Sequence, residues 1–206
     1  MPLHPLEPPS PWHASMHLRM ERGVCARADL IVTTRWHEAR LRGSYPGARV
    51  TRVSNGYDGD EMSGLEATVP PAQPLRILHA GMLTQRRSAT PFLEALARVL
   101  ASEPDWRGAL SVEFIGPRED ENEQSARRLN LGDALAFRDP LAHADILRAQ
   151  RAAHILLLVK HDNPRYDGLV PGKLYEYIGL RRPVLALAPA GEARELVASL
   201  RRGEVA

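Results

Sequence analysis

The polar residues best placed for chemistry lie at the start of a predicted helix, residues 171–180, which follows an apolar strand. Pro171 suits the first turn of a helix, so Gly172 and Lys173 would lie at its positive end and Glu176 one turn further on. In this arrangement Lys173 could reach a phosphate, and Glu176 could accept hydrogen bonds from the vicinal hydroxyls of a sugar. The alternative is a surface lysine three residues before a surface glutamate, which is a common helix pair.

A second candidate site follows the predicted strand 75–80. Gly81 comes directly after this strand, and Arg86 and Arg87 precede a helix that begins at Ser88. Backbone N–H groups, a helix N-terminus and guanidinium groups together suit a phosphate. The alternative is an ordinary turn that contains a glycine and carries solvated arginines.

The chain uses arginine as its default cation, since only two of its 27 basic residues are lysines. Both of them, Lys160 and Lys173, lie in one short stretch, where a compact and flexible ammonium group would differ in function from a guanidinium. Coincidence is the alternative explanation. A further loop, residues 114–118, also places a glycine after a strand, and it predicts only a turn.

Other patterns argue against several kinds of site. His13 and His17 have helical spacing but no evident third metal ligand, and His37 has no second histidine at the spacing of a zinc protease. The single cysteine, Cys25, excludes an internal disulfide and any multi-cysteine metal site. There is no P-loop, no Gly-x-Gly-x-x-Gly and no Gly-x-Ser-x-Gly, so we expect no metal or other cofactor.

The elements that must position these residues alternate between strand and helix. This pattern predicts an α/β fold with a parallel sheet covered on both faces. In such sheets ligands bind beyond the carboxyl ends of the strands, where both candidate sites fall. The predicted strands are 29–34, 49–53, 75–80, 110–115, 134–138, 154–159 and 183–188, and the predicted helices are 12–28, 36–45, 88–101, 119–131, 143–152, 171–180 and 191–200.

Composition divides the chain into four parts. Residues 1–11 are rich in proline and predict an extended arm, residues 12–58 a partial α/β domain that ends in an Asn-Gly turn, and residues 59–74 a linker. Residues 75–206 form the main domain. Another strand is due at 203–206, so we interpret the chain as the middle portion of a longer protein.

Charge and hydropathy limit the partners. A net charge of +2 provides no field that would hold nucleic acid, so none is expected. No apolar run is long enough to span a membrane, and the N-terminus lacks the pattern of a signal peptide. A cytoplasmic location is therefore expected.

Several of these segments together resemble retaining glycosyltransferases of the GT-B fold, of the group-1 or family-four type. The resemblance implies two Rossmann-like domains that face a cleft, an acceptor domain and a nucleotide-sugar donor domain. Residues 12–58 would be the last part of the first domain, and residues 75–206 most of the second. The matching segments are Ala28-Asp-Leu-Ile-Val-Thr-Thr34, Val53-Ser-Asn-Gly-Tyr-Asp58, Ile77-Leu-His-Ala-Gly81, Val170-Pro-Gly-Lys-Leu-Tyr-Glu-Tyr-Ile178 and Arg182-Pro-Val-Leu-Ala186.

The resemblance assigns roles to individual residues. Glu176 corresponds to the second glutamate of the family's pair and would bind the donor's ribose. The first glutamate falls on Gly168, and Asp167 is the neighbour that could replace it. Met82 stands where an arginine is usual, and Arg86 or Arg87 approximates the second basic position. The amides that hold the diphosphate fall around residues 170–173.

The resemblance also implies the reaction and its partners. A sugar would pass from a nucleotide-sugar donor to a glycan or lipid-linked acceptor, in the synthesis of cell-envelope polysaccharide, without a metal and with possible peripheral membrane contact. The alternative is a non-catalytic nucleotide-binding or structural module derived from such an enzyme. Gly168 and Met82 favour this alternative, because the family's polar groups are missing there.

Overall fold

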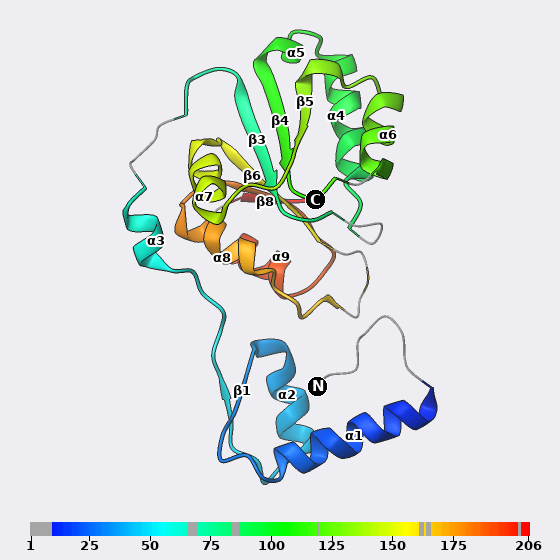
Figure 1. Cartoon of the computed structure of the whole chain (residues 1–206), viewed down its shortest axis with the longest axis vertical. Helices are drawn as coiled ribbons and strands as arrows, with labels where there is room; N and C mark the ends of the chain where they lie inside the picture. The colour runs from blue at the N-terminus through cyan, green and yellow to red at the C-terminus, as the bar shows by residue number, and fades with distance from the viewer. Residues whose placement is uncertain are drawn as a thin grey trace.

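A computed structural model describes residues 10–65, 70–83, 87–118, 120–160, 163, 166–201 and 203–206. The chain forms a small N-terminal lobe and a larger lobe, which an extended segment connects (Figure 1). Most of the expected arm, residues 1–9, lies outside the described residues. None of the helices within the described residues is long and apolar enough to cross a bilayer.

The small lobe has two helices and two short parallel strands. Helix α1 (Pro11–Cys25), β1 (Ile31–Thr33), α2 (Arg35–Ser44) and β2 (Val50–Arg52) follow one another as expected. Their core is small: Cys25, Leu41 and Val50 are its buried members. Helix α1 carries an apolar stripe that includes Met20 and Val24, and these two side chains are 59% and 63% exposed.

The connection between the lobes differs from the sequence-based expectation in two ways. Residues 53–58 run without a turn, so the Asn-Gly turn is wrong, and the expected linker contains a helix, α3 (Gly59–Ser63). The Asp58 side chain caps this helix by accepting from the amide of Asp60 at 2.8 Å. The segment Asp58-x-x-Glu61 matches a helix-capping pattern. This pattern explains why a helix forms in a segment whose lack of apolar periodicity predicted a linker.

The large lobe is a six-stranded parallel sheet in the order β5-β4-β3-β6-β7-β8. This arrangement confirms the α/β prediction, and the strand due near the end of the sequence is present as β8. The strands are β3 (Leu75–Ala80), β4 (Leu110–Ile115), β5 (Leu135–Arg138), β6 (Ile155–Val159), β7 (Val184–Leu187) and β8 (Gly203–Val205). The helices are α4 (Thr90–Ser102), α5 (Trp106–Ala109), α6 (Asp120–Arg128), the 3-10 turn η1 (Gly132–Ala134), α7 (His143–Ala152), α8 (Gly172–Gly179) and α9 (Glu192–Ser199).

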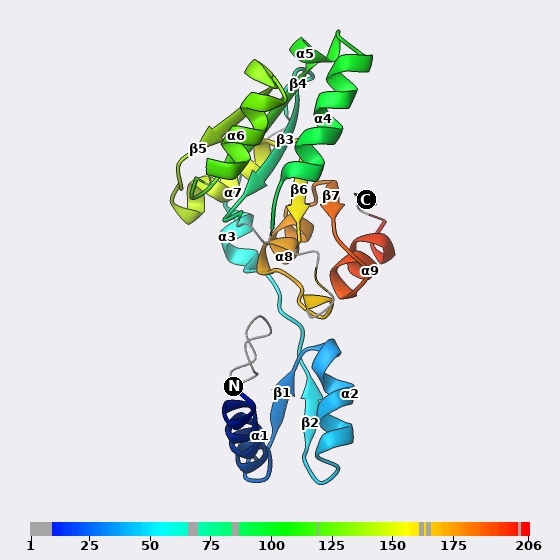
Figure 2. The ribbon, with the colours of Figure 1, turned by 90° about the vertical axis from the view of Figure 1, so that its right-hand side faces the viewer.

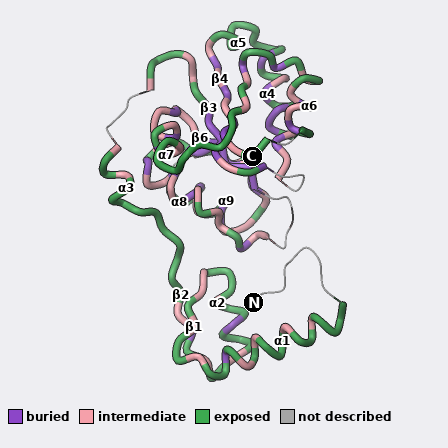
Figure 3. Tube along the Cα trace, viewed as in Figure 1, coloured by how far each residue is buried: buried purple, intermediate pink, exposed green. Residues whose placement is uncertain are grey.

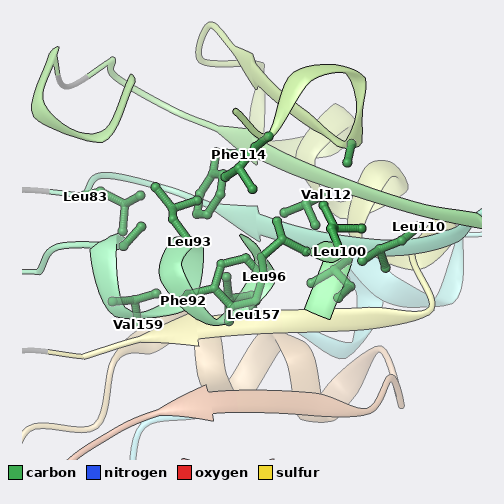
Figure 4. Packing of buried hydrophobic residues seen from close by; sticks show 14 residues of the cluster. Leu83, Phe92, Leu93, Leu96, Leu100, Leu110, Val112, Phe114, Leu157 and Val159 are labelled. Carbon is green, nitrogen blue, oxygen red and sulfur yellow. The ribbon is translucent and has the colours of Figure 1, made fainter. Parts of the chain in front are cut away.

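Two apolar cores lie on opposite faces of this sheet. Helix α4, with Leu93 and Leu96, packs on the face that carries Phe114 (Figure 4). Helices α7, α8 and α9 pack on the other face, where Leu174 and Tyr177 are fully buried. The buried residues follow the strands at the centre of the lobe (Figure 3), which makes the sheet a rigid support for the loops at its edge.

The expectation that both faces are covered is only partly correct. On β7, Val184 and Ala186 are buried beneath α8 and α9, whereas Leu185 and Leu187 on the opposite face are only half-buried. Within the described residues α4 and α6 are the helices that lie on this second face (Figure 2). A hollow of about 1300 Å³ lies between α4 and β7. Its lining is mainly apolar and includes Val99, while polar side chains such as Lys160 and Arg194 lie at the end of the hollow near the loops.

The two faces of β7 should respond differently to a polar side chain. Val184→Asn should lower the free energy of unfolding by about 3 kcal/mol or more, because the amide is buried without a partner. Leu185→Asn should cost about 1 kcal/mol, since water reaches this face. Urea unfolding of both variants checks the difference, and equal costs would show that the face is covered.

Candidate functional site

The site predicted from sequence lies between β3 and β6, where the order of the strands in the sheet reverses. Successive strands run outward from β3 through β4 to β5, and from β6 through β7 to β8 on the other side. The pairing of β3 with β6 ends at Leu78 and Leu156, so the two strands separate at their carboxyl ends. Crevices at such a switch point are where parallel α/β sheets bind ligands.

Lys173 extends from the first turn of α8 into this crevice. Its ammonium donates a 2.6 Å hydrogen bond to the carbonyl of Ala80, at the end of β3. Gly81 follows with a φ of +116°, and a Cβ there would lie 2.6 Å from the lysine Nζ. The two candidate sites proposed from sequence are therefore one site, and glycine at position 81 leaves the space that Lys173 occupies.

The Gly81 amide already has a hydrogen-bond partner in the sheet. Its N–H donates to the carbonyl of Ile115 at 2.7 Å, so it is not free for a phosphate. The adjacent Gly116 permits this close approach, because a Cβ there would lie 2.5 Å from the Gly81 oxygen. The first turn of α8, which begins after the extended Pro171, presents N–H groups without a helical partner at this edge.

Positive charge gathers in the crevice without a paired carboxylate. Burial lowers the pKa of Lys173 to about 8, and the neighbouring Arg87 contributes to the decrease, while Glu176 opposes it. The ion pairs among the described residues do not include Lys173 or Arg87, and the buried Nε of Arg87 has no hydrogen-bond partner among these residues. An anion is the ligand that would satisfy both cations.

Glu176 lies one turn beyond Lys173 on the same helix and is half-buried. Its charge acts on Lys173, which places the two side chains in one neighbourhood. The hydrogen bonds between described side chains do not include the Glu176 carboxylate. Its oxygens therefore remain available as acceptors for a ligand hydroxyl.

His79 belongs to this site, although the sequence analysis did not single it out. Its Nδ1 lies 2.9 Å from the carbonyl of Leu157, which also accepts from the Tyr177 hydroxyl at 3.4 Å. These side chains supply hydrogen bonds where the β3–β6 pairing has ended. A histidine inside the apolar strand 75–80 was the available signal.

Burial lowers the pKa of His79 to about 3, and the positive charge of Lys173 and Arg87 contributes. The neutral ring therefore has one N–H, on Nδ1, and it donates to Leu157. Its Nε2 has no hydrogen-bond partner among the described residues. The uncharged ring therefore links β3 to β6 by its hydrogen bond to Leu157, close to the two cations.

This histidine should make stability depend on pH. Because its pKa is lower in the folded than in the unfolded chain, the unfolded chain binds the extra proton first, and stability falls as the pH drops from about 6.5 toward 3. The slope should reach about 1.4 kcal/mol per pH unit. Urea unfolding from pH 7 to pH 4 should show a shallower slope for His79→Gln, and an unchanged slope would contradict the assignment.

The second lysine supports the loop that leads into α8. Lys160 is buried at the end of β6, where its Nζ donates to the carbonyl of Asp167 at 3.1 Å. The amide of Glu192 donates to the same carbonyl at 3.0 Å. Both lysines thus donate to a backbone carbonyl at one edge of the sheet. This shared arrangement favours a functional reason for their closeness in sequence over coincidence.

Three other residues belong to the loops considered from the sequence. Arg86 lies outside the described residues, and Met82 is 49% exposed. Arg118, in the third glycine loop, pairs with Glu123 and Asp139. Among the described residues no group of three or more potential ligands gathers around a metal position.

Gly168 is covered by a residue of the other lobe. A Cβ at this position would overlap the indole of Trp36, at the start of α2. The carboxylate that the resemblance places here therefore has no room, and Asp167 is the acidic residue beside it.

The comparisons with known proteins concern the fold of the chain. No family model matches the chain. Its fold matches that of WaaG, a glycosyltransferase involved in lipopolysaccharide biosynthesis, with a TM-score of 0.64 over 94% of this chain and 54% of that one, at 19% identity. Sucrose-phosphate synthase from Thermosynechococcus elongatus gives a TM-score of 0.65 over 93% of this chain and 48% of its own, at 18% identity.

The chain has the fold of the GT-B glycosyltransferases. Curated relatives of this GT-B chain are D-inositol 3-phosphate glycosyltransferases. The one from Geodermatophilus obscurus is 30% identical over 83% of this chain and 40% of its own, and the one from Catenulispora acidiphila is 28% identical over 67% and 36%. The GT-B chain therefore spans about two fifths of the length of these relatives. The resemblance noted from its motifs is confirmed.

Proposed function

We propose that the chain is a glycosyltransferase, or a piece of one, that moves a sugar from a nucleotide-sugar donor to a glycan or lipid-linked acceptor. The observation that carries the proposal is the pair of partly buried cations, Lys173 and Arg87, at the switch point of the sheet. These cations lack a paired carboxylate among the described residues and adjoin the N-terminus of α8. A diphosphate is the anion that suits such a site.

Each residue of the site has a distinct part in this proposal. Lys173 and Arg87 bind the diphosphate, together with the first free N–H groups of α8, at residues 172 and 173. As the sugar leaves, negative charge develops on the diphosphate, and the two cations stabilise it. Glu176 accepts hydrogen bonds from the ribose hydroxyls. We propose that these cations act without a metal.

The acceptor and the location are further parts of the proposal. WaaG is described as acting in lipopolysaccharide biosynthesis, which supports an acceptor of the cell envelope and a cytoplasmic enzyme that contacts the membrane. The exposed apolar stripe of α1, which includes Met20 and Val24, lies on a helix with Arg19 and Arg22. Such a helix suits contact with an anionic bilayer.

A second candidate function is a nucleotide-binding module without catalysis. The contact between Gly168 and Trp36 favours it, because the carboxylate expected there for the transferred sugar is replaced by an indole. The two functions share the diphosphate site and differ in turnover. Release of free sugar or transfer product from a bound nucleotide sugar distinguishes them.

Calorimetric titration of UDP, GDP and ADP against the chain tests the shared site. We expect one of the three to bind, and the matching nucleoside to bind more weakly because it lacks the charge that Lys173 and Arg87 neutralise. A failure of all three to bind would overturn both candidate functions.

A further inference from the structure

Trp36 is the residue by which the small lobe reaches the loop before α8. Its indole lies over Gly168, so closely that a Cβ on this glycine would overlap the ring. A second contact lies beside it, since Arg35 of the same helical turn pairs with Glu195 of α9 at 3.0 Å. The first turn of α2 thus contacts the large lobe at two points.

The loop under the indole has a fixed backbone. The carbonyl of Asp167 accepts from the Nζ of Lys160 at 3.1 Å and from the amide of Glu192 at 3.0 Å. The amide of Leu169 donates to the carbonyl of Tyr166 at 2.9 Å. Gly168 lies between these hydrogen bonds and is buried beneath the indole. The indole therefore lies against a loop whose backbone is held by hydrogen bonds on both sides of Gly168.

The indole lies within reach of a ligand bound at α8. Gly168 lies four positions before Gly172, the first residue of the helix, and a chain of this length spans at most about 14 Å. About half of the Trp36 surface, 48%, remains exposed after it has covered Gly168. Beside it, a buried carboxylate oxygen of Asp167 has no hydrogen-bond partner among the described residues.

A half-exposed indole beside the loop that leads into α8 suits a sugar ring. The C–H face of a pyranose is apolar and would pack on the indole. A nucleoside diphosphate alone, bound through Lys173 and Glu176, contains no pyranose ring that could contact the indole. The indole can therefore affect the sugar of a nucleotide sugar without affecting the nucleotide.

We propose that Trp36 is a specificity-determining residue, and that its indole packs against the sugar of the bound nucleotide sugar. The inference rests on the proposed function and adds to it a part of the donor site that comes from the small lobe. It assigns a pyranose with an accessible C–H face as the transferred group.

Paired titrations test the inference. UDP and UDP-glucose, GDP and GDP-mannose, and ADP and ADP-glucose are titrated against the parent chain and Trp36→Ala. For the nucleotide that binds, we expect the sugar conjugate to bind Trp36→Ala about five- to tenfold more weakly than it binds the parent, while the diphosphate binds both equally. Trp106→Ala, which removes another half-exposed tryptophan, should change neither affinity.

The possible outcomes separate the inference from the proposed function. Equal affinity of the sugar conjugate for the parent and Trp36→Ala overturns the inference and leaves the diphosphate site intact. Failure of every diphosphate to bind the parent overturns the proposed function, and the inference with it. If Trp36→Ala does not fold, Gly168→Ala gives the same test, because its methyl group must displace the indole.

Discussion

Lys173→Ala should weaken the binding of a nucleoside diphosphate about ten- to hundredfold, the range of a charge-assisted hydrogen bond. The ammonium lies at the carboxyl end of β3 with no acidic partner within ion-pair distance among the described residues. The matching nucleoside should bind the variant and the parent equally, because it has no phosphate. Calorimetry with both ligands gives the comparison.

The same lysine should make diphosphate binding depend on pH. Its pKa of about 8 in the free chain means that the ammonium loses its proton as the pH rises through 8, and affinity for the diphosphate should fall over that range. A bound anion favours the charged lysine, so binding near pH 8 should take up a proton. Lys173→Met, which keeps the bulk of the side chain, should lose the pH dependence and serve as the matched control.

An opposite pattern would contradict this role for Lys173. If Lys173→Ala weakened the nucleoside and the diphosphate equally, the lysine would support the fold of the crevice through Ala80 and would not bind phosphate. Arg148→Ala gives the baseline, because Arg148 is exposed on α7 and pairs with Asp145 away from the crevice.

Glu176→Ala should weaken the nucleoside and the diphosphate alike, by roughly 1–3 kcal/mol, because the ribose hydroxyls lose their acceptor. The 2′-deoxynucleotide should bind the parent more weakly and should bind Glu176→Ala about as well as the ribonucleotide does. Glu176→Gln keeps an acceptor oxygen and should lie between the two. Calorimetry provides all of these affinities.

The exposed Glu94 of α4 provides the control for charge, and Glu94→Ala should leave every affinity unchanged. If Glu176→Ala bound nucleotide as the parent does, Glu176 and Lys173 would form an ordinary surface pair on the helix.

The elements of the large lobe could be predicted because each carries its own local signal. Strand β6 is a run of five apolar residues, and α8 begins after Pro171, which fixes the helix start to within a residue. Parallel strands then bring their carboxyl ends to one edge, so Lys173 and Gly81 meet although 92 positions separate them. The order of these elements was sufficient to locate the candidate site.

The features that were missed depend on contacts distant in sequence. Nothing local to His79 indicates that its ring completes the bonding of Leu157 on another strand. The Gly81 amide looked free because its acceptor, Ile115, belongs to a neighbouring strand. The contact of Trp36 with Gly168 joins two lobes, and periodicity along the chain does not show it.

The most direct test of the donor site is a crystal structure of the chain with the nucleoside diphosphate that binds it in calorimetry. The proposal predicts both phosphates at the crevice between β3 and α8, within hydrogen-bond distance of Lys173 Nζ and the Arg87 guanidinium, with the ribose against Glu176. Phosphates bound elsewhere, for example in the apolar hollow beside α4 and β7, would contradict it.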